Sequence, residues 1–157
     1  MIYTSQLCSL YVLRIRGVQP SDIIPVVSLA YETLPERYNP VIFNQFYEAF
    51  PEGFLVAELD NTIIGFLIGV KTTQMTARIL MLSVDRAKRK QGIGSLLLST
   101  FLQVMKQLAV ISVELEVRTT NHGAIAFYKK HGFTIQETLH GFYQHKEDAF
   151  NMRKRLL

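Results

Sequence analysis

The first part of the chain alternates between apolar and polar positions in short blocks that predict strands and helices. Residues 12–18 alternate along their length, which predicts a strand. Pro20 then opens a helix, for which Ser21 is the expected N-cap and Asp22 a first-turn carboxylate that the helix dipole favours. The positions expected to form the buried face of this helix are Ile23, Ile24, Val27 and Ala30.

The next blocks predict a loop, a second helix and a hairpin. Residues 34–38 (Leu-Pro-Glu-Arg-Tyr) break the pattern and should form a loop. Residues 41–50 form a short helix that ends before Pro51, because proline cannot continue a helix. Two strands are expected at residues 54–59 and 62–70. A turn at Asp60-Asn61 should join them, since both residues tolerate the left-handed backbone of tight hairpins.

The second half of the chain alternates strands with helices. Strands are expected at residues 79–84, 110–117, 133–138 and 149–155. Gly92 and Gly94 precede a helix whose apolar positions recur about one turn apart: Ile93, Leu97, Phe101, Met105 and Leu108. Asn121 should cap a further helix that runs to His131, with Gly132 in the left-handed position beyond its end. A meander followed by alternating strands and helices predicts an α+β (mixed α/β) domain around one central sheet.

Composition supports one ordinary folded domain. The chain has 157 residues, of which 48% are apolar and 19% charged, and this excludes a disordered protein. A lone cysteine, Cys8, allows no internal disulfide and no cysteine-based zinc site, so a reducing cytoplasmic setting is expected. No apolar run approaches the length of a membrane span, and residues 1–13 lack the basic head and cleavage site of a signal peptide.

The net charge of +4 is consistent with three kinds of partner: nucleic acid, an acidic membrane or a small polyanion. Seven of the 17 basic residues lie in two places, and the rest of the chain holds more acidic than basic residues. Those places are Arg86, Lys88, Arg89 and Lys90, and then residues 153–155. Charge concentrated at one turn and one chain end favours a small polyanion over a long nucleic-acid track.

The turn at residues 82–94 carries the most informative chemistry. An apolar strand runs into Gly92-Ile93-Gly94, and a helix follows at once. Unpaired backbone N–H groups at such a helix start, together with the helix dipole, bind phosphate. The turn lacks the lysine and serine of a Walker loop and the third glycine of a dinucleotide fingerprint. On these residues alone, a basic surface turn before a core helix is an equal reading.

Four blocks carry a resemblance to a known family. The pattern Arg89-x-x-Gly92-x-Gly94 after Leu82-x-Val84 resembles motif A of the GNAT acetyltransferase superfamily. Residues 115–133 (LEVRTTNHGAIAFYKKHGF) resemble its strand–Asn–helix–Tyr–Gly-Phe segment. Residues 141–152 and the loop at residues 34–38 resemble the N-terminal protein acetyltransferases, the group of the ribosomal-protein and archaeal N-α-acetyltransferases.

The resemblance extends roughly over residues 12–155 and leaves residues 1–11 as an unmatched extension. It implies a single acetyltransferase domain over residues 1–157. Its fold would be a twisted mixed sheet of about six to seven strands flanked by about four helices. The implied reaction transfers the acetyl group of acetyl-CoA directly to an amine, with no metal. Consistent with that, the four histidines show no metal-ligand spacing.

The resemblance also implies a set of cofactor-binding residues. Backbone N–H groups of the turn would hold the CoA pyrophosphate, and the main chain of the preceding strand would pair with the pantetheine arm. The residues are Leu82, Ser83, Val84, Arg89, Lys90, Gln91, Gly92, Ile93, Gly94, Ser95, Asn121 and Tyr128. Asn121 is equally a helix cap whatever the function, and Tyr128 could simply pack on its helix face.

Three residues are candidates for the chemical step. Glu116 or Glu36 would accept the proton of the incoming amine, directly or through a water, and both remain open. Tyr128 matches the tyrosine at the CoA sulfur and would be the general acid. Other readings are a strand residue paired with Arg118 or a neighbouring chain for Glu116, and a solvated loop charge for Glu36.

The implied peptide-binding residues lie in two loops. They are Leu34, Pro35, Glu36, Tyr38, Phe142 and Tyr143. Phe142-Tyr143 stands where relatives carry two tyrosines, so one peptide hydrogen bond is lost. Arg78 and Met81 stand where many relatives carry histidine and serine, which excludes a histidine base there.

The expected function is therefore acetylation of the N-terminal α-amine of proteins or peptides in the cytoplasm. The resemblance also implies contact with the ribosome, and no membrane or specific nucleic acid as partner. The alternatives are a GNAT enzyme for a small amine (amino acid, polyamine or antibiotic) or for lysine side chains, and a non-catalytic CoA- or nucleic-acid-binding module. The preferred first residue, the oligomeric state and an auxiliary subunit stay open.

Overall fold

The computed structural model describes residues 2–8 and 11–157, so residues 1, 9 and 10 of the expected domain lie outside the described part. The strands are β1 (Ile2–Cys8), β2 (Tyr11–Gly17), β3 (Phe54–Leu59), β4 (Thr62–Lys71), β5 (Thr76–Val84), β6 (Ser112–Arg118), β7 (Thr134–Leu139) and β8 (Ala149–Arg155). The helices are α1 (Ile23–Thr33), α2 (Val41–Ala49), α3 (Ile93–Gln107) and α4 (His122–Lys130), with four short 3₁₀ turns.

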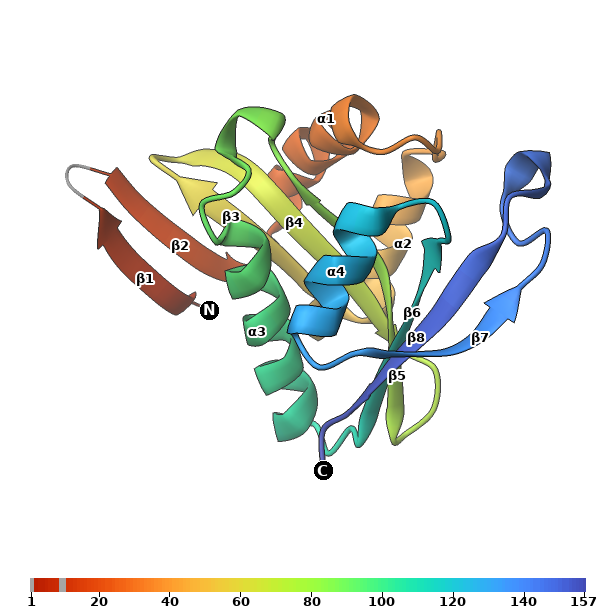
Figure 1. Ribbon diagram of the computed structural model, residues 1–157. Coiled ribbons are helices and arrows are strands. Elements are labelled where there is room, and N and C mark those ends of the chain that lie inside the picture. The colour runs from red at the N-terminus through yellow and green to blue at the C-terminus, as the bar shows by residue number, and fades with distance from the viewer. Residues whose placement is uncertain (1, 9–10) are drawn as a thin grey trace.

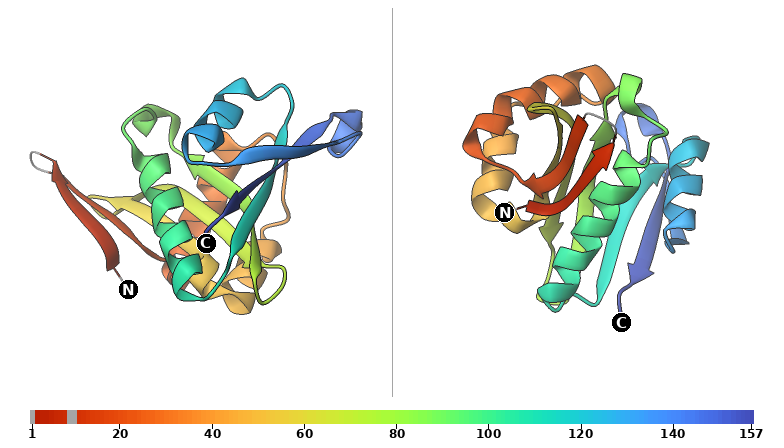
Figure 2. Two further views of the ribbon diagram at one scale, coloured as in Figure 1. Left: turned by 60° about the horizontal axis from the view of Figure 1, so that its bottom comes forward. Right: turned by 90° about the vertical axis from the view of Figure 1, so that its left-hand side faces the viewer.

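All eight strands form one mixed sheet in the order β1-β2-β3-β4-β5-β6-β8-β7 (Figure 1). Only β5 and β6 run parallel, and every other neighbouring pair is antiparallel. The expected mixed fold with four helices is confirmed. Strand β1 was not expected from the sequence. It pairs antiparallel with β2 at one edge of the sheet (Figure 2).

The helices cover the two faces of the sheet and divide the core in two. On one face, α1 and α2 pack over β3–β5 around Phe43 and Phe66. On the other, α3 and α4 pack around Phe101 and Phe133. Each core encloses side chains that are completely buried, as expected for a sheet with apolar residues on both faces.

Strand β5 changes face halfway along its length. Ile68 pairs with Met81 and Gly69 with Ile79, so Leu80 is an extra residue, a β-bulge, and is 38% exposed. Ile79 lies in the α3–α4 core and Met81 in the α1–α2 core, although strict alternation would put both on one face. The bulge therefore turns the second half of β5 relative to the first.

The bulge lies where β5 and β6 part. Their parallel pairing covers Thr76–Ile79 and Ser112–Leu115 and then stops, although β5 continues to Val84 and β6 to Arg118. We call this region, residues 80–84 of β5 and 116–118 of β6, the strand divergence. One edge of each strand lacks a strand partner there, and an extended ligand can pair with such an edge.

Most local predictions are confirmed, with two corrections at α1. Asp60 and Asn61 have positive φ in the hairpin turn, and Asn121 Oδ1 accepts the Ala124 N–H (3.1 Å) as an N-cap. Ser21 is not the N-cap of α1: Asp22 holds that position, and its carboxylate makes no capping bond to the helix but accepts the Gln19 N–H (2.7 Å). The buried face of α1 is Ile23, Val26, Leu29 and Ala30, whereas Ile24 is 81% exposed.

Candidate active site

The start of α3 offers a set of unpaired backbone donors. Gly92, in a left-handed conformation (φ 82°), is its N-cap and supplies no side-chain hydrogen bond. The first helical bond runs from Leu96 N to Gly92 O (3.0 Å). Within the described chain, the N–H groups of Ile93, Gly94 and Ser95 are therefore left to point out of the helix. Together with the helix dipole, these donors favour the binding of an anion.

Basic side chains flank this helix start. Lys90 has a positive φ of 62°, and both Lys90 and Gln91 are exposed. Arg89 Nε donates to the Val84 carbonyl (3.1 Å), so this arginine ties the turn to the end of β5. Ser95 Oγ lies 2.9 Å from His131 Nε2, which joins the first turn of α3 to the end of α4. Burial, with help from Lys130 and Lys154, lowers the pKa of His131.

The last residues of β5 leave one main-chain edge open. Leu82, Ser83 and Val84 pair with β4 on one side and have no strand partner on the β6 side. The Ser83 hydroxyl is buried and donates to Thr33 Oγ1 of α1 (2.6 Å). The main chain of Ser83, and not its hydroxyl, is thus available to a ligand at the strand divergence.

Tyr128 reaches this region from α4. Its ring packs edge-on against Phe127 and Phe133, with centroids 5.2 and 5.5 Å apart, and its side chain belongs to the α3–α4 core. Burial raises the pKa of Tyr128, so its hydroxyl stays protonated at neutral pH. A protonated phenol at the edge of the core is suited to donating a proton. Asn121 caps the same helix, which leaves the amide nitrogen of its side chain free.

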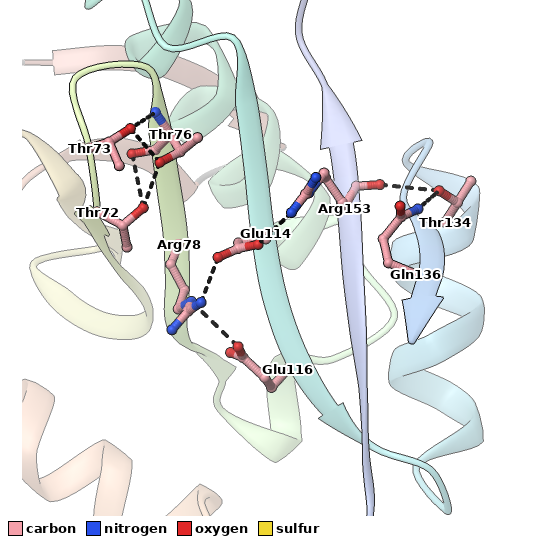
Figure 3. Close-up of polar contacts among 9 residues, drawn as sticks. All are labelled: Thr72, Thr73, Thr76, Arg78, Glu114, Glu116, Thr134, Gln136 and Arg153. Carbon is pink, nitrogen blue, oxygen red and sulfur yellow. Dashed lines mark hydrogen bonds and ion pairs between the residues drawn. The ribbon is translucent and has the colours of Figure 1, made fainter. Parts of the chain in front are cut away.

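Strand β6 presents a row of three charged residues on the α1–α2 side of the sheet. They are Glu114, Glu116 and Arg118. The residues between them face the other side of the sheet and are buried in the α3–α4 core: Val113, Leu115 and Val117. Glu116 Oε1 lies 3.4 Å from Arg78 Nε on β5 (Figure 3). Burial raises the pKa of Glu116 above its ordinary value of 4.5, although Arg78 and Asn151 lower it in part. A carboxylate with a raised pKa is suited to accepting a proton.

Arg118 links the two loops that the sequence assigned to the peptide. Its guanidinium pairs with Glu36 of the α1–α2 loop and with Glu147 of the β7–β8 loop (2.8 Å). The same group lies 4.1 Å from the centre of the Tyr143 ring, a cation–π contact. Glu36 is half-buried in an ion pair, so it is not a solvated loop charge. Arg118 pairs with these residues and not with Glu116.

The remaining aromatic residues of the two loops surround this ion pair. Burial raises the pKa of Tyr143 to about 12, and burial also raises the pKa of Tyr38. Phe142 is 50% exposed and meets Tyr143 edge-on, with centroids 5.0 Å apart. Leu34 packs on the α1–α2 core, whereas Pro35 is exposed. Phe142 and Pro35 thus offer apolar surface to solvent beside the charged residues.

The structure brings Glu36, Arg118, Tyr143 and Glu116 to one end of the sheet. The start of α3 lies across the strand divergence from them (Figure 1), and α4 carries Tyr128, whose pKa Tyr143 helps to raise. Two residues that sequence reasoning missed organise this region, Arg78 and Arg118. Charged residues alternate with apolar ones along β6, and this pattern could have indicated that Arg118 lies on the polar face of the strand. No pattern in the sequence indicated which residue pairs with Arg78, because the register between strands cannot be read from the sequence.

Two features are absent from the described residues. Among residues 2–8 and 11–157, no group of three or more His, Cys, Asp or Glu side chains is arranged to hold a metal ion. No helix in that part of the chain is long and apolar enough to span a membrane.

Comparison with known proteins places these features in a family. Residues 23–133 match the model of the acetyltransferase (GNAT) family. The N-alpha-acetyltransferase of Sulfolobus acidocaldarius is 30% identical over 151 residues, which cover 88% of this chain and 90% of the relative.

Solved structures agree in fold and in sequence. Ard1 from Thermoplasma volcanium superposes with a TM-score of 0.89 at 36% identity, over 92% of this chain and 98% of that chain. Naa50 from Arabidopsis thaliana, solved with the bisubstrate analogue CoA-Ac-MVNAL, superposes with a TM-score of 0.78 at 26% identity, over 90% of this chain and 97% of that chain.

Proposed function

The chain belongs to the acetyltransferase (GNAT) family, and from this premise we propose that it acetylates the N-terminal α-amine of proteins or peptides. It is an acetyltransferase, and its relatives are named for N-terminal acetylation. The observation that carries the proposal is the strand divergence. An anion site lies on one side of it, and on the other a buried carboxylate and two loops joined by Arg118.

Acetyl-CoA is the proposed co-substrate, and it supplies the acetyl group as a reactive thioester. The free N–H groups of residues 93–95 fit its pyrophosphate, and the left-handed Gly92 opens the backbone to it. The open main-chain edge of residues 82–84 fits the amide groups of the pantetheine arm. The same edge offers backbone N–H groups to negative charge that develops on the carbonyl oxygen. Arg89, Lys90, Gln91 and Asn121 would complete this proposed cofactor site. The Naa50 relative was solved with an analogue that contains CoA.

The proposed base is Glu116, with Glu36 as the second candidate. An α-amine has a pKa of about 7.7–8.0, so a carboxylate needs to remove its proton only as the new bond forms. The Glu116 carboxylate is held by a loose ion pair and has a raised pKa, and both properties favour proton acceptance. Glu36 is bonded tightly to Arg118, which favours a role in holding the loops together.

Tyr128 is the proposed general acid. Its hydroxyl keeps its proton at neutral pH, as a phenol ordinarily does, and burial raises its pKa further. The hydroxyl would donate that proton to the leaving sulfur. Tyr128 and Glu116 come from opposite faces of the sheet, one from α4 in the α3–α4 core and one from β6 on the α1–α2 side. Tyr128 would thus give a proton to the sulfur from one face of the sheet, while Glu116 would take a proton from the amine on the other.

The two loops form the proposed peptide site. Leu34, Pro35, Tyr38, Phe142 and Tyr143 would cover the first residues of the substrate, with Arg118 and its two carboxylate partners fixing the distance between the loops. Phe142 has no side-chain hydroxyl, so of this pair only Tyr143 would make a side-chain hydrogen bond to the peptide.

We also propose that all 157 residues act as one domain in the cytoplasm and meet substrates at the ribosome. Contact with the ribosome is supported by a groove of about 420 Å³ between α3 and β8. In it, Lys106, Lys154 and Arg155 lie beside His131. Of the described residues that line it, none is acidic. Co-sedimentation with ribosomes should weaken as salt rises and in the K106E/R155E variant. Salt-independent sedimentation, or none, would contradict this part.

Mass spectrometry of a peptide library incubated with acetyl-CoA tests the function. We expect a mass gain of one acetyl group, located by fragmentation on the α-amine of peptides with particular first residues. Peptides blocked at the α-amine but carrying lysine, and a set of polyamines and amino acids, provide the matched controls. Acetylation of these controls alone would overturn the proposal in favour of a small-amine or lysine enzyme. Absence of turnover with every amine would leave a binding module.

A further inference from the structure

Arg78 occupies the last part of β5 that still pairs with β6. It lies opposite Glu114 in the parallel register, and its Nη2 donates to Glu114 Oε1 at 2.5 Å. Its Nε faces the next carboxylate along β6, 3.4 Å from Glu116 Oε1. Figure 3 shows both glutamates reaching from β6 toward the one guanidinium. Arg78 thus stands immediately before the strand divergence, between the paired strands and the candidate base.

The two carboxylates are held in different ways. Glu114 receives hydrogen bonds from Arg78 and from Arg153 of β8 (3.2 Å), and together these lower its pKa despite its burial. Glu116 receives no such bond from Arg78, because the geometry at 3.4 Å is that of an ion pair only. Arg78 Nε is the one buried side-chain donor without a hydrogen-bond partner among the described residues.

An unpaired buried donor is normally unfavourable, so its presence needs a reason. Here the donor faces a carboxylate that would have to accept a proton during the reaction. A full hydrogen bond would occupy a lone pair of that carboxylate and reduce its basicity. The Arg78 contact is an ion pair without a hydrogen bond, so it favours the charged carboxylate and leaves available the lone pair that a bond from Arg78 would occupy.

Other charged and polar groups lie on the elements packed around Glu116. They are Glu114 and Arg118 on β6, Asn151 and Arg153 on β8, Glu36 and Tyr38 of the α1–α2 loop, and Tyr143 and Glu147 of the β7–β8 loop. Arg118 is committed to Glu36 and Glu147, and Arg153 to Glu114. Among these described groups, Arg78 is the cation that pairs with Glu116.

We propose that Arg78 is a positioning residue that holds Glu116 ionised and directed toward the incoming amine. The inference rests on the proposed function, because it assigns a task within that reaction. Arg78 touches neither substrate nor cofactor in it. The proton leaves the amine nitrogen for the Glu116 carboxylate, and Arg78 acts by keeping that carboxylate unprotonated beforehand. The first carboxylate, Glu114, fixes the guanidinium so that its Nε faces the second.

The first test measures the pKa of Glu116 in the ligand-free protein. In samples with ¹³C-labelled glutamate, the side-chain carboxyl signal of Glu116, assigned by its loss in E116Q, is followed against pH. We expect R78Q to raise the pKa by about one pH unit or more, since it removes an adjacent opposite charge. R153Q is the matched control: it also removes an arginine partner of Glu114 but does not touch Glu116, and it should move the pKa much less. An unchanged pKa in R78Q overturns the inference.

The second test follows kcat/KM for a peptide against pH. In R78Q, the acid limb that depends on Glu116 should move upward by the same amount as the pKa, and the limb of R153Q should stay with the wild type. R78K keeps the charge and should keep the limb near its wild-type position while kcat falls, and it replaces R78Q if that variant does not fold. A limb that moves equally in R78Q and R153Q overturns the inference. Wild-type protein that acetylates no peptide instead overturns the proposed function, and the carboxyl titration still decides the role of Arg78.

Discussion

Two clusters of arginine and glutamate or aspartate lie on the α1–α2 side of the same sheet and differ in how completely they are bonded. In the first, Arg16 of β2 bonds both oxygens of Asp22 (2.6 and 3.0 Å) and also Glu58 (3.3 Å). In the second, at the strand divergence, Arg78 bonds Glu114 and leaves its Nε facing Glu116 without a hydrogen bond. We call them the Arg16 cluster and the Arg78 cluster.

The difference suits the Arg16 cluster to stabilising the fold and the Arg78 cluster to taking part in proton transfer. In the Arg16 cluster, burial alone would raise the pKa of Asp22, but its bonds with Arg16 and the Gln19 N–H lower it. In the Arg78 cluster, burial prevails, and the pKa of Glu116 is raised. A carboxylate with hydrogen bonds to both oxygens and a lowered pKa strengthens the fold, whereas a carboxylate with a raised pKa, which its arginine contacts without a hydrogen bond, can exchange a proton. The contrast indicates which cluster belongs to the reaction.

The largest expected effect comes from breaking the Arg16 cluster. R16Q leaves two largely buried carboxylates without their partner, and we expect the free energy of unfolding to fall by about 3 kcal/mol. Urea denaturation measures this loss, while kcat per folded molecule should stay at the wild-type value. A stable R16Q with reduced kcat would show that the two clusters are not separate in function.

The next effect comes from removing the candidate base. E116Q should lower kcat about 100-fold, as is usual for the loss of a general base, with little change in melting temperature. E36Q is the matched comparison, because the second candidate lies in the other part of the site. We expect E36Q to raise the KM for peptide more than it lowers kcat. The reverse pattern in the two variants would assign the base to Glu36.

A smaller effect is expected at the start of α3. Gly92 and Gly123 both lie at helix starts with no atom near an added Cβ, but only Gly92 has a positive φ. G92A should strain the backbone by about 1–2 kcal/mol and raise the KM for acetyl-CoA roughly 10-fold. G123A should leave that KM unchanged. Equal KM values in the two variants would remove the helix start from the cofactor site.

The smallest effect is expected at the loop ion pair. Glu147 is about half exposed, and an exposed ion pair contributes only about 0.2–1 kcal/mol. E147Q should therefore raise the KM for peptide only about 2-fold, and less at high salt, with kcat unchanged. Steady-state kinetics at two salt concentrations measure this. A large loss of kcat would mean that Arg118 and its partners take part in the chemical step.

Local signals in the chain predicted most of the fold. The helix that begins after Gly92, the turn at Asp60-Asn61 and the cap at Asn121 each depend on a few adjacent residues, and the structure has all three. Strand β1 was missed because residues 1–11 have no matched block and strand pairing depends on distant partners. The N-cap residue of α1 is Asp22 and not Ser21, and the distant residue Arg16 of β2 holds the Asp22 carboxylate in place.

The candidate site was predictable wherever its chemistry is carried by a contiguous motif. The glycine turn and the position of Tyr128 follow from short blocks, and these blocks also carried the resemblance. The partners of the charged side chains were not predictable, because they depend on strand register. The bulge at Leu80 and the parallel pairing of Arg78 with Glu114 place Arg78 beside Glu116, 38 positions away in the chain, and no local pattern encodes either feature.

Acid titration of rate and fold in the same samples tests the central claim most directly. Asp22 has a lowered pKa in the folded chain, so its stabilisation is complete above its unfolded pKa and is lost only as pH falls through the lower folded value. Glu116 has a raised pKa and protonates first. As pH falls below the pKa of the α-amine, log kcat/KM should fall with a slope of about one. As pH falls further and Glu116 protonates, the slope should steepen to about two. This second change should occur above pH 4.5, where circular dichroism still reports the native fold. E116Q should keep the single slope. Activity that steepens only where the chain unfolds, or an identical profile in E116Q, would contradict the account.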